Sequence, residues 1–172
     1  LDALDARLDS LELATTSHDA SELLRAGSPA EAFTRADAAL NTWRGTPFAD
    51  LDHVSAVAPH RHALEATRYT LQTTRLAAAV TLGRTAWALP EAELLAAAAP
   101  HDEQRAALLA ELLHRSGRRG EALAVIAATR RTLRTDWGVE PGRELVRLEE
   151  QILTPTPVGR GANRAPFSGR DA

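Results

Sequence analysis

One sequence layout occurs twice in this chain of 172 residues, and it constrains the fold more than any other feature. Each copy has a glycine, a short turn and then the triplet Glu-Ala-apolar, at 27–33 and again at 117–123. Glycine permits the backbone conformation of a tight turn between helices, and Gly117 and Gly120 are expected to bracket the second turn. The small Ala122 would let the helix after that turn approach its neighbour closely. One such hairpin cannot bury its apolar face alone, so the layout predicts a stack of helical hairpins.

The positions of apolar residues predict helices along most of the chain, because alanine and leucine recur at helical spacing. Isoleucine occurs only twice, and β-branched residues never alternate over the length of a strand. The predicted helices cover residues 3–16 with a continuation to Leu24, then 29–43, 59–82, 85–99, 101–117, 118–135 and 143–153. The predicted fold class is therefore all-α, an array of about seven helices similar to tetratricopeptide repeats.

Local signals predict where individual helices begin and end. Ser17 or Asp19 is expected to cap the continuation to Leu24, and Asp102 or its neighbour to cap the fifth helix. Ser28 is expected to begin a capping box, with a proline at the first helical position. Pro90 is expected to end one helix and begin another.

Composition excludes several classes of function. The 20 basic residues are all arginine, and the chain has no cysteine or methionine. A Walker A phosphate loop and a Schiff base both need lysine, and thiol catalysis or cysteine-ligated zinc needs cysteine. With a net charge of −3, the chain as a whole is not a polycation of the kind that binds nucleic acid. No apolar run is long enough for a membrane span.

Candidate groups for bond chemistry or metal binding are weak. His60 and His62 are two residues apart, so they point to different faces of a helix. Asp50 and Asp52 follow a Pro-Phe turn, where loop polarity explains them. We therefore predict a protein that is not an enzyme and has no cofactor and no metal. A cleft that gathers His53 with His60 and Asp52 around a ligand would instead indicate an enzyme.

Arginines and tryptophans are the candidate contact residues. The arginines could complement helix dipoles and solvate an exposed face, or they could contact an acidic protein surface or DNA phosphates. Trp43 and Phe48 are expected to anchor the 44–58 loop, Trp137 to anchor helices, and Trp87 either to do the same or to lie at a partner surface. The candidate contact residues are Arg115, Arg118, Arg119, Arg130, Arg131, Arg134 and Trp87.

Four motifs, in the right order, resemble one family. Residues 43–50 (WRGTPFAD), 82–84 (LGR), 112–123 (LLHRSGRRGEAL) and 133–145 (ending WGVEPGREL) are similar to motifs of the bacterial transcriptional activation domain in regulators of the antibiotic-regulatory-protein (SARP) type. The resemblance covers about residues 1–153, with Trp137 and His114 as departures. Its motif residues here are Trp43, Gly45, Pro47, Phe48, Gly83, Gly117, Gly120, Ala122, Gly138, Pro141 and Leu145.

The resemblance implies a cytoplasmic module for protein–protein interaction in a transcriptional regulator, with no membrane partner. Its implied partners are a second copy or other domains of the parent, and RNA polymerase through that parent. DNA would be bound only by a winged-helix domain, which this chain lacks. The main alternative is a general tetratricopeptide adaptor that binds a peptide in its groove.

The last segment of the chain differs in composition. Residues 154–172 contain repeated proline and glycine with little to bury, so they are expected to form a flexible linker after a domain at 1–153. Residues 165–171 resemble the start of an ATPase domain found in large regulators of this type. The chain also begins with Leu1 and not with methionine, so we expect it to be part of a longer protein.

Overall fold

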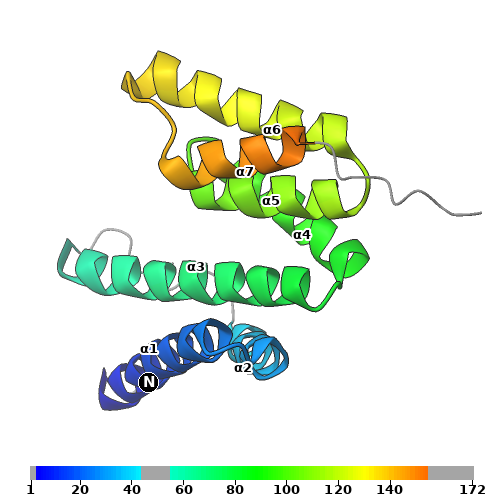
Figure 1. The fold of residues 1–172 in the computed structure, drawn as a ribbon. Coiled ribbons are helices and arrows are strands. Elements are labelled where there is room, and N and C mark those ends of the chain that lie inside the picture. The colour runs from blue at the N-terminus through cyan, green and yellow to red at the C-terminus, as the bar shows by residue number, and fades with distance from the viewer. Residues whose placement is uncertain (1–2, 44–54, 155–172) are drawn as a thin grey trace, which may run out of the picture.

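The computed structural model describes residues 3–43 and 55–154, and these residues form helices and turns without a strand. A short 3-10 turn, η2 (Ser55–Val57), precedes α3, and a π-helical turn, η3 (Leu133–Trp137), follows α6. The predicted all-α fold is confirmed, and Figure 1 shows the helices stacked in an array. The helices are α1 (Ala3–Arg25), α2 (Pro29–Asn41), α3 (Ala58–Thr81), α4 (Thr85–Ala98), α5 (Glu103–Arg115), α6 (Arg119–Thr132) and α7 (Arg143–Leu153).

The helices pack as stacked hairpins. Each odd-numbered helix contacts the next odd-numbered one, from α1 through α3 and α5 to α7. Each even-numbered helix packs on the two helices that precede and follow it in sequence. The long α3 separates α1 and α2 from α4–α7 (Figure 1). This is the arrangement that the repeated Gly–turn–Glu-Ala layout predicts, because every hairpin buries its apolar face against a neighbour.

Two hydrophobic clusters form the core. The smaller lies among α1, α2 and α3 and consists of Ala20, Ala36, Ala39 and Leu71. The larger spans α3 to α7, and its fully buried members include Leu112, Ile126, Leu145 and Ile152. Alanine supplies the whole buried face of α2, so the backbones of α1, α2 and α3 approach one another closely.

Two predicted interruptions of helices are wrong. The helix α1 continues through Ser17 and Asp19 to Arg25. Ser17 is buried, and the carboxylate of Asp19 accepts a hydrogen bond from Arg35 at 3.0 Å, so neither residue caps a new helix. The helix α4 likewise continues through Pro90. Proline removes one hydrogen bond from the helix, and Pro90 lies on the exposed side, where solvent can satisfy the freed carbonyl.

The capping prediction at α2 holds in position only. Ser28 is the N-cap residue, and a proline follows it at the first helical position. The Ser28 side chain, however, makes no cap hydrogen bond. By contrast, Asp102 caps α5 as predicted for that helix, because its carboxylate accepts from the Arg105 N–H at 3.1 Å.

The glycines of the motifs take different roles. Gly83, Gly117 and Gly138 have φ values of 70°, 78° and 66°, and each follows the end of a helix or helical turn. Gly120 does not bracket a turn, because α6 has already begun at Arg119. Gly45, Pro47 and Phe48 lie outside the described residues, as does the segment after Thr154.

Gly117 and Gly120 form a matched pair for testing this turn. Gly117→Ala is expected to destabilise the protein by roughly 1–2 kcal/mol, because alanine must adopt the left-handed conformation. Gly120→Ala is expected to stabilise it by about 0.4–1 kcal/mol, since alanine reduces the conformational freedom of the unfolded chain and nothing lies within 4 Å of the added Cβ. Thermal unfolding followed by circular dichroism measures both, and shifts of the same sign would contradict this account of the turn.

Candidate interaction surfaces

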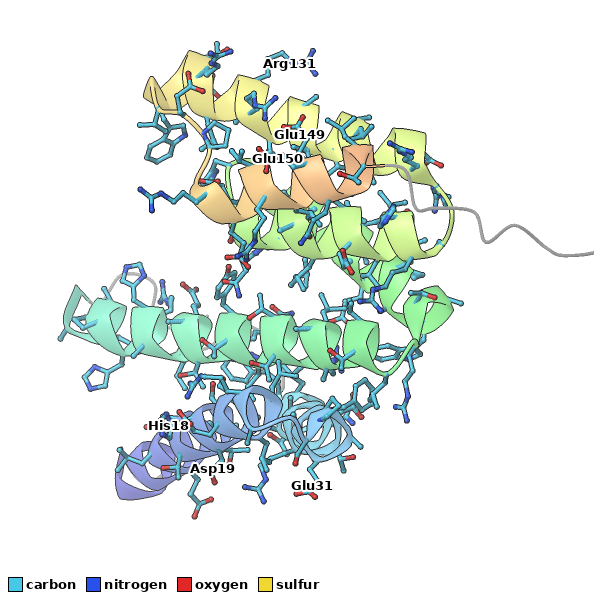
Figure 2. The ribbon with its side chains drawn as sticks, viewed as in Figure 1. His18, Asp19, Glu31, Arg131, Glu149 and Glu150 are labelled. Atoms are coloured by element: carbon cyan, nitrogen blue, oxygen red, sulfur yellow. The ribbon has the colours of Figure 1, made fainter. Side chains whose placement is uncertain are left out.

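Two of the candidate arginines, Arg118 and Arg130, each form a bidentate salt bridge with one glutamate. Arg118 donates to both oxygens of Glu121, at 2.7 and 2.6 Å, and lies 3.6 Å from Glu93 on α4. The hydrogen bond to Glu121 raises the pKa of the Arg118 guanidinium. Arg130 donates to both oxygens of Glu149, which lies between α7 and α6 in Figure 2. These guanidinium groups join elements of the domain and are already occupied.

Three further candidate arginines also have partners within the domain. Two pair with carboxylates on exposed surfaces, and one donates to the backbone at the end of α7. The pairs are Arg115 with Glu111 at 2.6 Å, Arg134 with Glu140 at 2.8 Å and Arg119 with the Leu153 carbonyl at 2.5 Å. Exposed pairs of this kind contribute little to stability, but they leave less charge available for a partner.

Arg131 differs from the other five candidates. It is exposed on α6, and it has no hydrogen bond or ion pair among residues 3–43 and 55–154. Its side chain projects from the outer edge of α6, away from the rest of the domain (Figure 2). Of the predicted arginines, Arg131 is therefore the one whose charge a partner could use without breaking an internal contact.

Trp87 lies at the junction of α2, α3 and α4. Its ring meets Phe33 edge-to-face at a centroid distance of 5.1 Å, and the Arg75 guanidinium lies 5.3 Å from it. Arg75 also bridges Asp37 on α2 and Glu91 on α4, at 2.6 and 2.5 Å. Trp87 is nevertheless 47% exposed, so it anchors the junction and also presents an edge to solvent.

The other tryptophans lie near the surface. Trp43 is half-buried with Arg68 at 5.5 Å from its ring, consistent with a contact between α2 and α3. The predicted anchoring position of Trp137 is wrong, because this side chain is 63% exposed; its ring lies 5.4 Å from that of His101. The positive φ of Gly138 ends η3 directly after Trp137.

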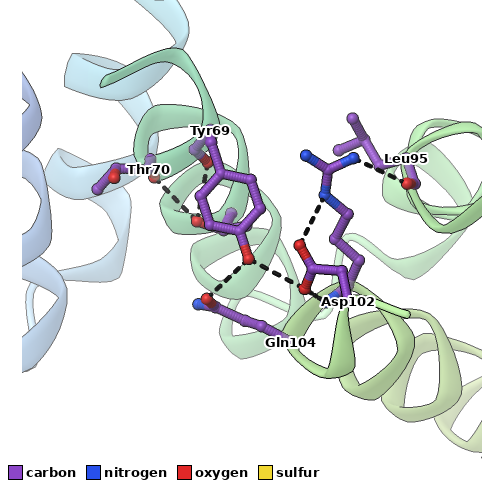
Figure 3. Close-up of polar contacts among 7 residues, drawn as sticks. Tyr69, Thr70, Leu95, Asp102 and Gln104 are labelled. Atoms are coloured by element: carbon purple, nitrogen blue, oxygen red, sulfur yellow. Dashed lines mark hydrogen bonds and ion pairs between the residues drawn. The ribbon is translucent and has the colours of Figure 1, made fainter. Parts of the chain in front are cut away.

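A polar junction joins α3 to α5 (Figure 3). The Tyr69 hydroxyl lies 3.1 Å from Asp102 and 3.0 Å from the side-chain oxygen of Gln104. Arg105 pairs with Asp102 at 3.2 Å, donates to the Leu95 carbonyl at 3.1 Å and lies 4.8 Å from the tyrosine ring. Asp102 thus caps α5 and connects it to α3.

This junction predicts a specific dependence of stability on pH. Burial, followed by the charge of Asp102, raises the pKa of Tyr69 to about 12. The unfolded chain loses this proton near pH 10 while the folded chain keeps it. Stability is therefore expected to fall as the pH rises from about 10 to about 12. The chain has one tyrosine and no lysine or cysteine, so no other side chain titrates in this interval.

Tyrosinate absorbance and denaturant unfolding at a series of pH values would measure the effect. Tyr69→Phe is the matched variant, and it should lose this part of the pH dependence. A native midpoint near pH 10 would contradict the prediction.

The described part of the domain has several hollows, and two of them bear on the binding of a partner. An apolar groove of about 340 Å³ lies between α4 and α6, with Leu109 of α5 in its floor. A second hollow, of about 320 Å³, lies between α1 and α3 and is lined largely by hydroxyl and amide side chains, including Tyr69 and Gln104. The described residues contain no group of histidines and carboxylates arranged to hold a metal ion. No helix among them is both long and apolar enough to cross a bilayer.

Sequence reasoning did not single out Arg75 or the α4–α6 groove. A signal for Arg75 exists in the sequence, because it follows Leu71 by four residues on the apolar stripe of α3. A signal for the groove is the run LLAAAA at 94–99, which leaves α4 without a polar side over its second half.

A family model described as "Bacterial transcriptional activator domain" matches residues 8–153. The chain belongs to this family. The regulatory protein AfsR of Streptomyces griseus is 38% identical over 135 residues, which cover 78% of this chain and 14% of that protein. The regulatory protein DnrI of Streptomyces peucetius is 34% identical over 129 residues, which cover 74% of this chain and 47% of that protein. This chain thus spans less than half the length of these relatives.

A solved structure supports the same assignment. Mycobacterium tuberculosis EmbR, in complex with a low-affinity phosphopeptide, matches with a TM-score of 0.79 and 28% identity over 84% of this chain and 38% of that one. EmbR is named a transcriptional regulatory protein, and AfsR and DnrI are named regulatory proteins. The resemblance to a SARP-type activator domain is therefore confirmed.

Proposed function

We propose that this activator domain is a non-catalytic interaction and oligomerisation module, which couples a DNA-binding domain to other domains of its parent regulator and to RNA polymerase. The observation that carries the proposal is the apolar groove between α4 and α6, on a domain in which five of the six candidate arginines are paired internally. A stack of hairpins suits this role because its surface is rigid and extended. The names of the relatives as regulators support it.

The proposal extends to the parent protein. Residues 1–153 would be the activator domain and 154–172 a linker toward a further domain, and the family match ending at residue 153 supports this boundary. DNA would be bound by a winged-helix domain of the parent, in the cytoplasm. Arg131 and the exposed edge of Trp87 are the contact residues that the geometry favours among the predicted set.

A fusion experiment tests the proposed function. The 172-residue chain is joined to a monomeric DNA-binding domain, and occupancy of two adjacent operator sites is compared with that of the DNA-binding domain alone. The fusion is expected to bind the two sites cooperatively, and cooperativity should fall when the sites are moved apart. Independent binding of the two sites at every spacing would reject the oligomerisation role.

The hollow between α1 and α3 favours a second candidate function, the binding of an extended peptide. Its lining offers Ser21, Thr73 and other hydroxyl groups, but its one guanidinium, Arg25, pairs with Glu22. This hollow therefore suits an uncharged peptide better than a phosphopeptide such as the one EmbR binds. Titration with phosphorylated and unphosphorylated forms of one peptide would distinguish these ligands.

A further inference from the structure

We infer that the groove between α4 and α6 is a two-fold interface at which two copies of this chain bind each other. The inference rests on the proposed oligomerisation role and assigns it to one surface. It depends on three properties of that surface: an apolar groove, an exposed leucine beside its lining residues on α4, and opposite charges near its two ends.

The groove and the exposed leucine are adjacent. Ala96 and Ala97 of α4 form one wall, and Val125 and Ala128 of α6 form the other. Leu94 is 74% exposed on α4, one turn before the wall residue Ala97. A helix without a polar side is normally covered on all sides, yet this part of α4 faces solvent.

A projecting side chain next to a groove makes the surface complementary to itself. In a two-fold dimer, a residue on one copy contacts a site on the other, and the reverse contact forms at the same time. Leu94 of each copy would enter the groove of its partner. The small alanines of both walls leave room for a leucine and allow close approach of the helices.

Charges at the ends of the groove favour the same arrangement. Glu93 is the one charged residue among those that line the groove. It marks the end where α6 begins, because it lies 3.6 Å from Arg118. Arg131 is near the opposite end, next to the lining residue Thr132. An antiparallel two-fold arrangement places Arg131 of each copy over Glu93 of the other, so unlike charges meet twice.

Sedimentation velocity of the 172-residue chain over a wide range of concentrations tests the inference. The chain is expected to form a dimer, and Leu94→Asp should weaken dimerisation roughly thirtyfold or more, as for a residue at the centre of an interface. The matched control is Leu11→Asp, because Leu11 is 64% exposed but lies on α1. It should leave the dimer unchanged.

A charge exchange provides a second test that does not depend on Leu94. Arg131→Glu and Glu93→Arg should each weaken the dimer roughly tenfold, and the double variant should restore it. A dimer that Leu94→Asp and both charge variants leave intact would overturn the assigned surface while leaving the oligomerisation role in place. A chain that stays monomeric, or whose groove binds only a helix from another protein, would overturn the inference; independent binding in the fusion experiment would reject the proposed function itself.

Discussion

Replacing Arg75 with alanine is expected to destabilise the domain by about 2 kcal/mol, between the cost of losing an exposed ion pair and that of breaking a buried one. The Arg75 side chain is 13% exposed and joins three helices. Its loss would leave Asp37 of α2 and Glu91 of α4 without their cation. It would also remove the guanidinium that lies against Trp87.

Two variants control for the general effect of removing an arginine. Arg35→Ala breaks an ion pair with Asp19 in which both side chains are nearly half exposed, so its effect should stay below about 1 kcal/mol. Arg75→Lys keeps the charge but cannot bridge two carboxylates with one planar group, so its loss should be intermediate. Denaturant unfolding measures all three. Equal effects of Arg75→Ala and Arg35→Ala would show that the junction contributes no more than a surface pair.

Most of the fold could be predicted because its determinants are local. The spacing of Ala32, Ala36 and Ala39 predicts one buried face on α2, and all three are buried. The errors at Ser17 and Pro90 have a different origin. Whether a serine caps a helix or is buried within it depends on neighbours from other parts of the chain, which periodicity does not report.

The candidate contact residues were harder to predict, because a cluster of arginines in sequence does not show where their partners lie. Arg118 pairs with Glu121 three residues later, which helical spacing could have indicated. The partner of Arg130 is Glu149, on another helix. Only the packing of α6 against α7 brings these two residues together, and only that packing distinguishes Arg131 as unpaired among the described residues.

Leu71→Ala and Leu76→Ala are expected to cause similar losses of about 2–5 kcal/mol, the usual cost of removing a buried leucine, but in different parts of the stack. Both residues lie on α3 and are at most 1% exposed. Leu71 belongs to the small cluster with Ala20, Ala36 and Ala39, whereas Leu76 belongs to the large cluster that extends to α7. Each variant therefore serves as the control for the other.

Hydrogen exchange would show where each loss acts. Leu71→Ala should speed exchange in α1 and α2, because that cluster holds them on α3, while α5–α7 should keep most of their protection. Leu76→Ala should instead speed exchange in α5–α7, while α1 and α2 should keep most of their protection. In a stacked array each hairpin contacts only its neighbours, so stability is distributed along the stack. If either variant opened all seven helices together, the domain would be one cooperative unit, and a contact at α4 and α6 could then influence α1 directly.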